Sequence, residues 1–379
     1  MELVAPKKNL LRLLARCQGV ADKKSTMPVL ANVLLSTEGN LLRISATDLY
    51  LAVTGSVEAE IKRAGSVAVP ARDLFERVKH MPDGPIQVSV GNGAATVIKA
   101  VGSARRYTLH GLPGGDFPTL PVPDPQAVQI ELPVDTLAQL IARTHFSIST
   151  DETRAHLNSA LFECQPGLVR MVTTDGHRLS KMEIQVEGLQ ATTTMLVPLK
   201  AIGELRRLLE EVTENRSTTL VKISQTGPNA FFYLLGVQFS VKLIDAQFPP
   251  YEAVIPSVTD RALRTPRVPL SDALRAVSLA ASDRTGGVKL GVSKNALRIT
   301  SESPESGNGF DEVVVDYSGP DLSVGFNARY LLDVLGAMDD DEVTIGLSGE
   351  LDPAVVKPAA AADAPRKNDY IAVVMPMRI

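Results

Sequence analysis

The sequence lacks several features that would assign it to a class of protein at once. It has two cysteines in 379 residues, Cys17 and Cys164, and they match no metal-ligand spacing. Isolated cysteines of this kind indicate buried thiols in a reducing compartment. The first residues contain no apolar segment of signal-peptide length, and no apolar run is long enough to cross a bilayer. We therefore expect a cytoplasmic protein that does not contact a membrane.

Catalytic and metal-binding signatures are missing as well. There is no phosphate-binding loop ending in Gly-Lys-Ser/Thr and no nucleophile elbow. The five histidines are not paired at metal-ligand spacing. The acidic cluster 339–342 is typical of a solvated turn after a helix. We expect no metal, no cofactor and no catalytic residue.

The charge balance excludes one kind of nucleic-acid binder. A formal net charge of −4 argues against a protein that is basic over its whole surface. It still allows basic residues gathered on one face, because the local field matters more than the sum. Hydrophobic residues make up 44% of the chain, which is enough for ordinary buried cores.

A domain-sized repeat is the main positive feature. The acidic residues Asp48, Asp175 and Glu302 follow similar apolar-threonine segments and are separated by steps of 127 residues. A second repeated position has nearly the same spacing, at Val69-Pro70, Val197-Pro198 and Phe326-Asn327. Such a period is far longer than that of a solenoid, so it predicts three similar domains in tandem.

Each third contains two helical patterns and several strand patterns. Apolar stripes begin the thirds, at Leu10, Leu13, Leu14 and Cys17, then Leu137, Leu140 and Ile141, then Leu274 and Val277 after a Ser271 or Asp272 cap. Pro70 and Pro198 suit first helical positions, and Asn327 suits a cap. Between the helices, segments such as 237–243 and 86–90 alternate as one-sided strands, the latter before a Gly91-Asn92-Gly93 hairpin turn. The pattern favours an α+β fold with antiparallel sheets.

Proline, glycine and alanine mark the connecting segments. Residues 112–125 and 248–269 read as linkers between the thirds, and 357–367 reads as a flexible excursion. The last residues, 373–379, read as a strand at an edge or surface, because proline is disfavoured inside a central strand. An edge carrying methionine and valine is a candidate peptide-docking site.

The segment 174–179 (TDGHRL) has two interpretations. Asp175 could orient His177 as a general base. Alternatively, Asp175-Gly176 is a turn whose aspartate bonds its own backbone. The repeat favours the turn, because Asp48 and Glu302 occupy the same position without a following histidine.

Motifs along the whole chain resemble one family, the DNA polymerase III β subunits or bacterial sliding clamps. The resemblance is carried, in family order and spacing, by 26–30 (TMPVL), 116–118 (DFP), 174–179 (TDGHRL), 248–251 (FPPY), 327–335 (NARYLLDVL) and the terminal VMPMR.

The resemblance implies three clamp domains, at 1–122, 129–249 and 252–379. It implies a head-to-tail homodimer whose six domains form a ring around duplex DNA, with helices lining the hole and antiparallel sheets outside. The expected function is processive DNA replication without chemistry of its own. The expected partners are double-stranded DNA bound without sequence preference, the polymerase III catalytic subunit, the clamp loader, and other polymerases and repair proteins that dock through short linear peptides.

The implied sites are of three kinds. The first kind is basic residues that would face DNA and attract its phosphates: Lys8, Arg12, Arg16, Lys24, Arg72, His156, Lys200 and Arg207. For the helix face formed by Lys8, Arg12 and Arg16, an ordinary solvated surface is an equally good interpretation. Ala155 stands where some clamps have an aromatic residue that stacks on a base. The floor and walls of the implied partner-peptide pocket are Leu157, Thr174, Gly176, His177, Arg178, Leu179, Pro249, Val254, Val373, Met375, Pro376, Met377 and Arg378. Its neighbouring groove is implied at Arg154, Asn327, Tyr330 and Pro353, and the dimer contact at Tyr107 and Leu109 against Leu279.

Two other functions remain as alternatives. One is an enzyme acting on nucleic acid, with Asp175, His177 and acidic residues of the last third at a metal site. The other is a protein scaffold that does not bind DNA.

Overall fold

The computed structural model describes residues 1–22, 25–215, 220–257, 259–282, 286–304, 306–359 and 368–379. Within these ranges, one order of elements occurs three times: a strand, a helix, a group of strands, a second helix and three further strands. The first repeat adds a short strand, β5, to this order. The repeated α+β architecture predicted from the 127-residue period is therefore confirmed.

The elements of the first repeat are β1 (Glu2–Pro6), α1 (Lys7–Cys17), β2 (Asn32–Glu38), β3 (Leu41–Thr47), β4 (Leu51–Glu58), β5 (Glu60–Arg63), β6 (Ser66–Pro70), α2 (Ala71–Lys79), β7 (Pro85–Val90), β8 (Ala95–Ala100) and β9 (Arg106–His110). The short strand β10 (Leu112–Pro113) follows.

The elements of the second repeat are β11 (Gln129–Pro133), α3 (Val134–Thr144), β12 (Ser159–Gln165), β13 (Leu168–Thr174), β14 (Arg178–Gln185), β15 (Thr193–Pro198), α4 (Leu199–Asn215), β16 (Leu220–Thr226), β17 (Asn229–Leu234) and β18 (Val237–Lys242). Those of the third are β19 (Arg261–Pro266), α5 (Arg267–Ser278), β20 (Gly287–Ser293), β21 (Ala296–Ser303), β22 (Gly307–Val314), β23 (Leu322–Asn327), α6 (Ala328–Gly336), β24 (Glu342–Leu347), β25 (Ala354–Pro358) and β26 (Asn368–Val374). Short 3₁₀ turns include η4 (His145–Ser147) and η5 (Tyr251–Val254).

Of the four sheets formed by the described residues, two are shared between consecutive repeats. The nine-stranded sheet has the order β10-β6-β2-β3-β4-β18-β17-β16-β11, so β4 of the first repeat pairs with β18 of the second. The eight-stranded sheet has the order β15-β12-β13-β14-β26-β25-β24-β19, so β14 of the second repeat pairs with β26 of the third. The remaining sheets are β5-β1-β7-β8-β9 and β22-β21-β20-β23. The ladders are antiparallel, as predicted.

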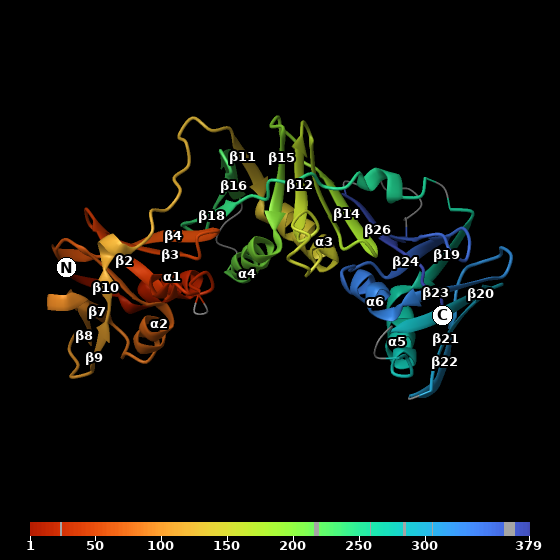
Figure 1. Cartoon of the computed structure of the whole chain (residues 1–379), viewed down its shortest axis with the longest axis horizontal. Coiled ribbons are helices and arrows are strands. Elements are labelled where there is room, and N and C mark those ends of the chain that lie inside the picture. Colours follow the sequence, from red (N-terminus) through yellow and green to blue (C-terminus); the bar gives the residue numbers. More distant parts are fainter. Residues whose placement is uncertain (23–24, 216–219, 258, 283–285, 305, 360–367) are drawn as a thin grey trace. The chain divides into compact units, whose positions relative to one another are not determined.

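Because the sheets join neighbouring repeats, the compact units do not coincide with the repeats. Unit 1 consists of residues 1–135 and 203–243, and unit 2 of residues 136–202 and 244–379. The second repeat is therefore divided between the two units. Within each unit, two helices lie side by side, α1 with α2 and α5 with α6 (Figure 1).

Apolar stripes explain where the helices pack. Leu10, Leu14 and Cys17 of α1 are buried, as the spacing predicted. Burial raises the pKa of the Cys17 thiol to about 12, so it remains a neutral, unreactive thiol. Cys164 is likewise a buried free thiol, which confirms the structural interpretation of both cysteines.

Three predictions of helix starts need correction. Helix α5 begins at Arg267, so Ser271 and Asp272 lie inside it and do not cap it. Pro70 directly precedes the first helical residue of α2, and Pro198 directly precedes that of α4. Asn327 does cap α6, because its side chain accepts a hydrogen bond from the Arg329 amide.

The predicted linkers and the predicted terminal strand also change. Segment 248–269 already contains β19 and the start of α5, and 112–125 contains β10. Lys357 and Pro358 belong to β25, whereas 360–367 lie outside the described residues. Strand β26 is paired on both sides, with β14 and β25, and Pro376 lies beyond its end. The predicted edge strand is therefore an interior one, and the tail leaves the sheet before the proline.

Candidate partner-binding site

A small apolar pocket lies in unit 2, at the end of the eight-stranded sheet. Its volume is about 180 Å³, below the roughly 300–1,000 Å³ of sites that hold drug-sized ligands. It is the size of a receptor for one or two side chains. Its lining consists of Leu157, Thr174, Gly176, Arg178, Leu179, Pro249, Tyr251, Val254, Val373 and Met375.

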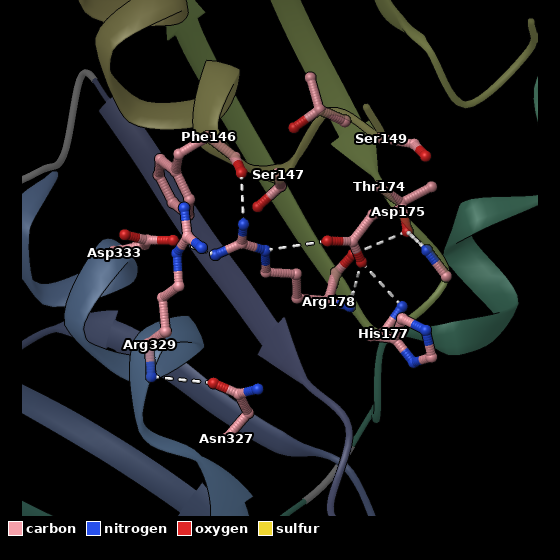
Figure 2. Close-up of polar contacts among 12 residues, drawn as sticks. Phe146, Ser147, Ser149, Thr174, Asp175, His177, Arg178, Asn327, Arg329 and Asp333 are labelled. Atoms are coloured by element: carbon pink, nitrogen blue, oxygen red, sulfur yellow. Dashed lines mark hydrogen bonds and ion pairs between the residues drawn. The ribbon is translucent and has the colours of Figure 1, made fainter. Parts of the chain in front are cut away.

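The β13–β14 turn forms one wall of this pocket. The Thr174 hydroxyl donates to the Arg178 carbonyl at 2.7 Å, and one Asp175 carboxylate oxygen accepts from the amides of His177 and Arg178 at 2.8 and 3.0 Å. Gly176 has a φ of +91°, a conformation that is unfavourable for most side chains. The Asp175 turn predicted from the sequence is therefore confirmed (Figure 2).

The same turn recurs in the first repeat but not at the predicted place in the third. The Asp48 carboxylate accepts from the amides of Tyr50 and Leu51 at 2.9 and 2.6 Å. Glu302, by contrast, lies inside β21 and pairs with Asn308 of β22. The prediction of a third acidic turn at Glu302 is wrong, because the strand continues through that residue.

Arg178 is the one charged side chain in the lining, and its charge is already neutralised. Its guanidinium donates to Asp175 at 3.1 Å, to Asp333 of α6 at 2.6 Å and to the carbonyl of Phe146 at 2.6 Å (Figure 2). The guanidinium also lies 4.5 Å from the centre of the Tyr330 ring. Because these partners occupy it, the pocket presents an apolar surface.

His177, which was predicted in the pocket wall, lies outside the lining, beside the predicted groove residues. The His177 ring stacks on the Tyr330 ring, with 6.3 Å between the centroids. Arg154 donates to the Asp175 carbonyl at 3.2 Å, on the Gly176 side of the turn. Asn327 lies three residues before Tyr330, at the N-terminus of α6. These residues come together in unit 2 but do not line the pocket itself.

The C-terminal tail forms a second wall, in part. The Met375 amide donates to the His177 carbonyl at 2.9 Å, and the Met377 amide donates to the Gly325 carbonyl at 2.8 Å. Pro376, Met377 and Arg378 follow Met375 but are outside the lining. Pro353 directly precedes β25, whose Val355 pairs with Val373. The predicted set therefore holds for Met375 and Val373 and is too wide for the residues after them.

Tyr251 is a lining residue that the sequence prediction omitted. It belongs to η5 and packs against a core cluster that includes Leu161, Leu179 and Val373. Burial raises the pKa of its phenol to about 12, and its hydroxyl accepts a hydrogen bond from Arg170 at 2.9 Å. The signal was present, because Tyr251 ends the Phe-Pro-Pro-Tyr motif.

The predicted DNA-facing residues divide into exposed and engaged ones. Lys8 and Arg12 of α1, Arg72 of α2 and Lys200 of α4 are exposed, and His156 is half-buried. Lys24 lies outside the described residues.

Arg16 contradicts its prediction. Its side chain is 7% exposed, bonds Glu211 at 2.6 Å and donates to the Leu235 carbonyl at 2.7 Å. Arg16 therefore connects α1 to residues 203–243, the section of the second repeat that belongs to unit 1. It does not share an exposed face with Lys8 and Arg12. Arg207 is half-exposed, but its guanidinium donates to the Arg16 carbonyl at 2.9 Å, at the end of α1. Its hydrogen bonds therefore stabilise a helix terminus.

The predicted dimer residues also divide. Leu279 is 82% exposed, and Tyr107 on the edge strand β9 is half-buried. Leu109 is 3% exposed in the isolated chain, so its side chain belongs to the core of unit 1. Its assignment to a subunit contact is wrong for the side chain, because a neighbour cannot reach it.

The geometry does not support the alternative of a catalytic Asp175–His177 pair. Asp175 accepts from the His177 backbone amide, while the imidazole stacks on Tyr330. Within the part of the chain that the structure describes, no group of three His, Cys, Asp or Glu side chains could hold a metal ion. Nor is any helix in the described ranges long and apolar enough to cross a membrane.

The order of elements that occurs three times and the apolar pocket are features of a binding protein of the clamp type. Residues 1–121, 131–250 and 252–378 match the N-terminal, central and C-terminal domain models of the DNA polymerase III beta subunit. The chain is 34% identical over 383 residues to the beta sliding clamp of Pseudomonas putida, with all of both chains covered. It is 34% identical over 363 residues to that of Caulobacter vibrioides, covering 94% of this chain and 95% of the relative.

Solved structures agree with these matches. A crystal structure of the Pseudomonas aeruginosa sliding clamp, DNA polymerase III subunit beta, bound to griselimycin superposes with a TM-score of 0.91 at 33% identity, covering all of both chains. The chain therefore belongs to the DNA polymerase III beta subunit family. Its function is that of a non-catalytic processivity clamp for DNA polymerase III in DNA replication.

Proposed function

We propose that two copies of this chain form a ring around duplex DNA and that the pocket at Gly176 and Met375 holds short peptides of its partners. The partners would be the polymerase III catalytic subunit, the clamp loader, and other polymerases and repair proteins, acting in the cytoplasm. The observation that supports peptide docking is an apolar receptor whose one charged side chain, Arg178, is already neutralised. A peptide would anchor apolar side chains there without an unpaired charge being buried.

The docking site can be tested with Met375→Ala. Met375 is 37% exposed and lines the pocket, so its loss removes apolar contact with a bound side chain. We expect affinity for a fluorescent peptide carrying the clamp-binding segment of the polymerase catalytic subunit to fall about tenfold. Met27→Ala, at another exposed methionine, is the matched control and should leave affinity unchanged. Equal affinities in all three proteins would reject the site.

Two open sheet edges support the dimer. Strand β9 ends one sheet and β22 ends another, so each has backbone groups without a neighbouring strand in that sheet. The outward face of β22 carries Phe310 and Val314, which are 65% and 79% exposed. Pairing β9 of one copy with β22 of the other would continue the sheets, as β4–β18 and β14–β26 do within the chain.

Charges at these edges suit that pairing. The strand β9 and the residue before it carry Arg106 and Arg105, and β22 carries Asp311 and Glu312. Phe310→Asp should convert the dimer to a monomer in light scattering, whereas Tyr233→Asp, at an exposed aromatic in unit 1, should not. A wild-type chain that stays monomeric at working concentration would contradict the ring.

The exposed basic residues support passage of DNA through the ring. Lys8, Arg12, Arg72 and Lys200 are helix residues suited to sequence-independent phosphate attraction. Protein loaded by the clamp loader should stay on circular DNA and leave it once the DNA is linearised. Equal retention on both forms would favour direct binding over enclosure.

A further inference from the structure

A row of charged side chains crosses the eight-stranded sheet beside the pocket. Glu163 of β12, Arg170 of β13 and Glu183 of β14 lie directly opposite one another in register. Arg170 donates to Glu163 at 3.1 Å and also bonds Glu183, and Lys181 reaches Glu183 at 3.1 Å. These four side chains are 17–20% exposed. Two cations balance two anions, so the row needs no external ligand.

Among the described residues, the row is connected to the pocket lining by the hydroxyl of Tyr251. Arg170 donates to this hydroxyl at 2.9 Å, and the hydroxyl lies 3.4 Å from a Glu163 oxygen to which it donates. The ring of Tyr251 packs in the apolar cluster that includes Leu161 and Val373. Tyr251 therefore has its polar end in the charged row and its ring in the pocket wall.

The wall that Tyr251 belongs to is a connecting segment, not a strand. Pro249, Tyr251 and Val254 supply three of the lining residues, and all lie in 249–254. The 3₁₀ turn is closed by local backbone bonds, such as that from Ala253 to Pro250. The hydroxyl of Tyr251 supplies the side-chain hydrogen bonds that connect this segment to the strands.

Comparison of the repeats separates this arrangement from a requirement of the fold. An arginine occupies the same strand position in each repeat, as Arg43, Arg170 and Arg298. Arg43 and Arg298 side chains are 44% and 61% exposed and bond a single glutamate each. Opposite Arg43 stand Ser36 and Ser56, not carboxylates. The shielded row occurs in the second repeat, which supplies most of the pocket lining.

We propose that Arg170 is a positioning residue for partner binding: through the Tyr251 hydroxyl, it fixes segment 249–254 and so sets the width of the pocket. This inference rests on the proposed peptide-docking function. Arg170 acts without touching the peptide, because it is not a lining residue.

A double-mutant cycle tests the route from Arg170 to the pocket. Tyr251→Phe keeps the ring and removes the hydroxyl, and Arg170→Gln removes the guanidinium. Each should weaken binding of the labelled polymerase peptide about fivefold, which is less than the full effect of a charge-assisted hydrogen bond because this bond acts on the peptide only through the segment it holds. The double variant should also lose about fivefold, because both changes break the same link.

The outcomes are separable. A double variant that loses the product of the two effects, about 25-fold, would show that Arg170 acts independently of Tyr251 and would overturn the proposal. Unchanged affinity in Tyr251→Phe would overturn it as well, and that variant keeps the packing needed to fold. Arg170→Lys should restore part of the loss, and Arg43→Gln should leave affinity unchanged. Failure of the wild-type chain to bind the peptide would instead reject the docking function itself.

Discussion

The turns at Thr47–Leu51 and Thr174–Arg178 have the same backbone and different surroundings. In both, a threonine hydroxyl donates to the carbonyl four residues on, and an aspartate accepts two amides. In both, the residue after the aspartate has a positive φ, +77° at Leu49 and +91° at Gly176. The second turn lines the pocket, whereas Leu49 is 52% exposed. The turn is thus a property of the repeat, and the pocket is a property of the side chains placed on it.

The tail position differs in the same way. The Lys242 amide donates to the Tyr50 carbonyl, and the Met375 amide donates to the His177 carbonyl, so these two residues are equivalent. A lysine stands at the first position and an apolar, adaptable methionine at the second. Substitutions that place residues of the first-repeat turn in the second-repeat turn, or the reverse, distinguish the stability of the turn from peptide binding at the pocket.

The largest effect is expected from Gly176→Leu, which copies the first turn into the second. The backbone tolerates it, since Leu49 holds the same conformation, at a cost of about 1–2 kcal/mol. The new side chain would stand at the pocket lining and should weaken peptide binding at least about 100-fold in a fluorescence titration. Leu49→Gly is the matched control and should not change affinity. A Gly176→Leu protein that binds normally would place the docking site elsewhere.

The repeated fold and the turn at Asp175 could be predicted from the sequence. The 127-residue period, the apolar helix stripes and the Asp175 turn depend on local spacing, which the chain carries directly. The role of Arg16 was not readable, because its partner Glu211 lies 195 residues away in another repeat. Leu109 was misassigned for a related reason: an alternating strand does not reveal which of its faces a distant element covers. Tyr251, by contrast, could be predicted from the sequence, because it ends the Phe-Pro-Pro-Tyr motif.

The next effect concerns two arginines at equivalent places in α1 and α3. Arg16 is 7% exposed and bonds Glu211 at 2.6 Å, whereas Arg143 faces Asp339 at 3.4 Å, and that aspartate is 98% exposed. Arg16→Met should lower the free energy of unfolding by about 3 kcal/mol, because it removes the shielded ion pair with Glu211 and the hydrogen bond to the Leu235 carbonyl. Arg143→Met should cost less, about 1 kcal/mol, because its partner Asp339 is exposed and stays hydrated when the arginine is removed. Denaturant titration of each variant measures the difference, and equal losses would contradict this distinction.

A smaller effect is expected at Asp48 and Asp175. Asp48→Asn should cost about 1 kcal/mol, since an amide oxygen replaces a charged acceptor. Asp175→Asn should cost about 1 kcal/mol more, because Asp175 also pairs with the buried Arg178. Hydrogen exchange at the amides of residues 50 and 177 reports each turn separately. Faster exchange at residue 50 than at residue 177 in the matched variants would reverse the expected order.

The smallest effect is the pH dependence of the charged row. Burial alone would raise the pKa of Glu183, but the hydrogen bond from Lys181 and the charges of Lys181 and Arg170 hold it below its usual 4.5. A carboxylate whose pKa is lower in the folded than in the unfolded state stabilises the fold at any pH above its unfolded-state pKa. This contribution is lost as the pH falls through its folded-state pKa. Thermal unfolding of wild type and Glu183→Gln should therefore differ most near neutrality and converge below pH 4.5. A difference that grows as the pH falls would contradict the sign.

The sharing of sheets between repeats has a mechanical consequence. A fragment of residues 1–122 would lose β18 and leave β4 paired only with β3, and one of residues 252–379 would lose β14 and leave β26 paired only with β25. The sequence repeats are thus not the compact units of the fold, because a ladder of backbone hydrogen bonds joins each repeat to the next. Cutting the chain at a boundary between repeats would therefore break a ladder inside a compact unit, whereas the chain passes from one unit to the other within the second repeat.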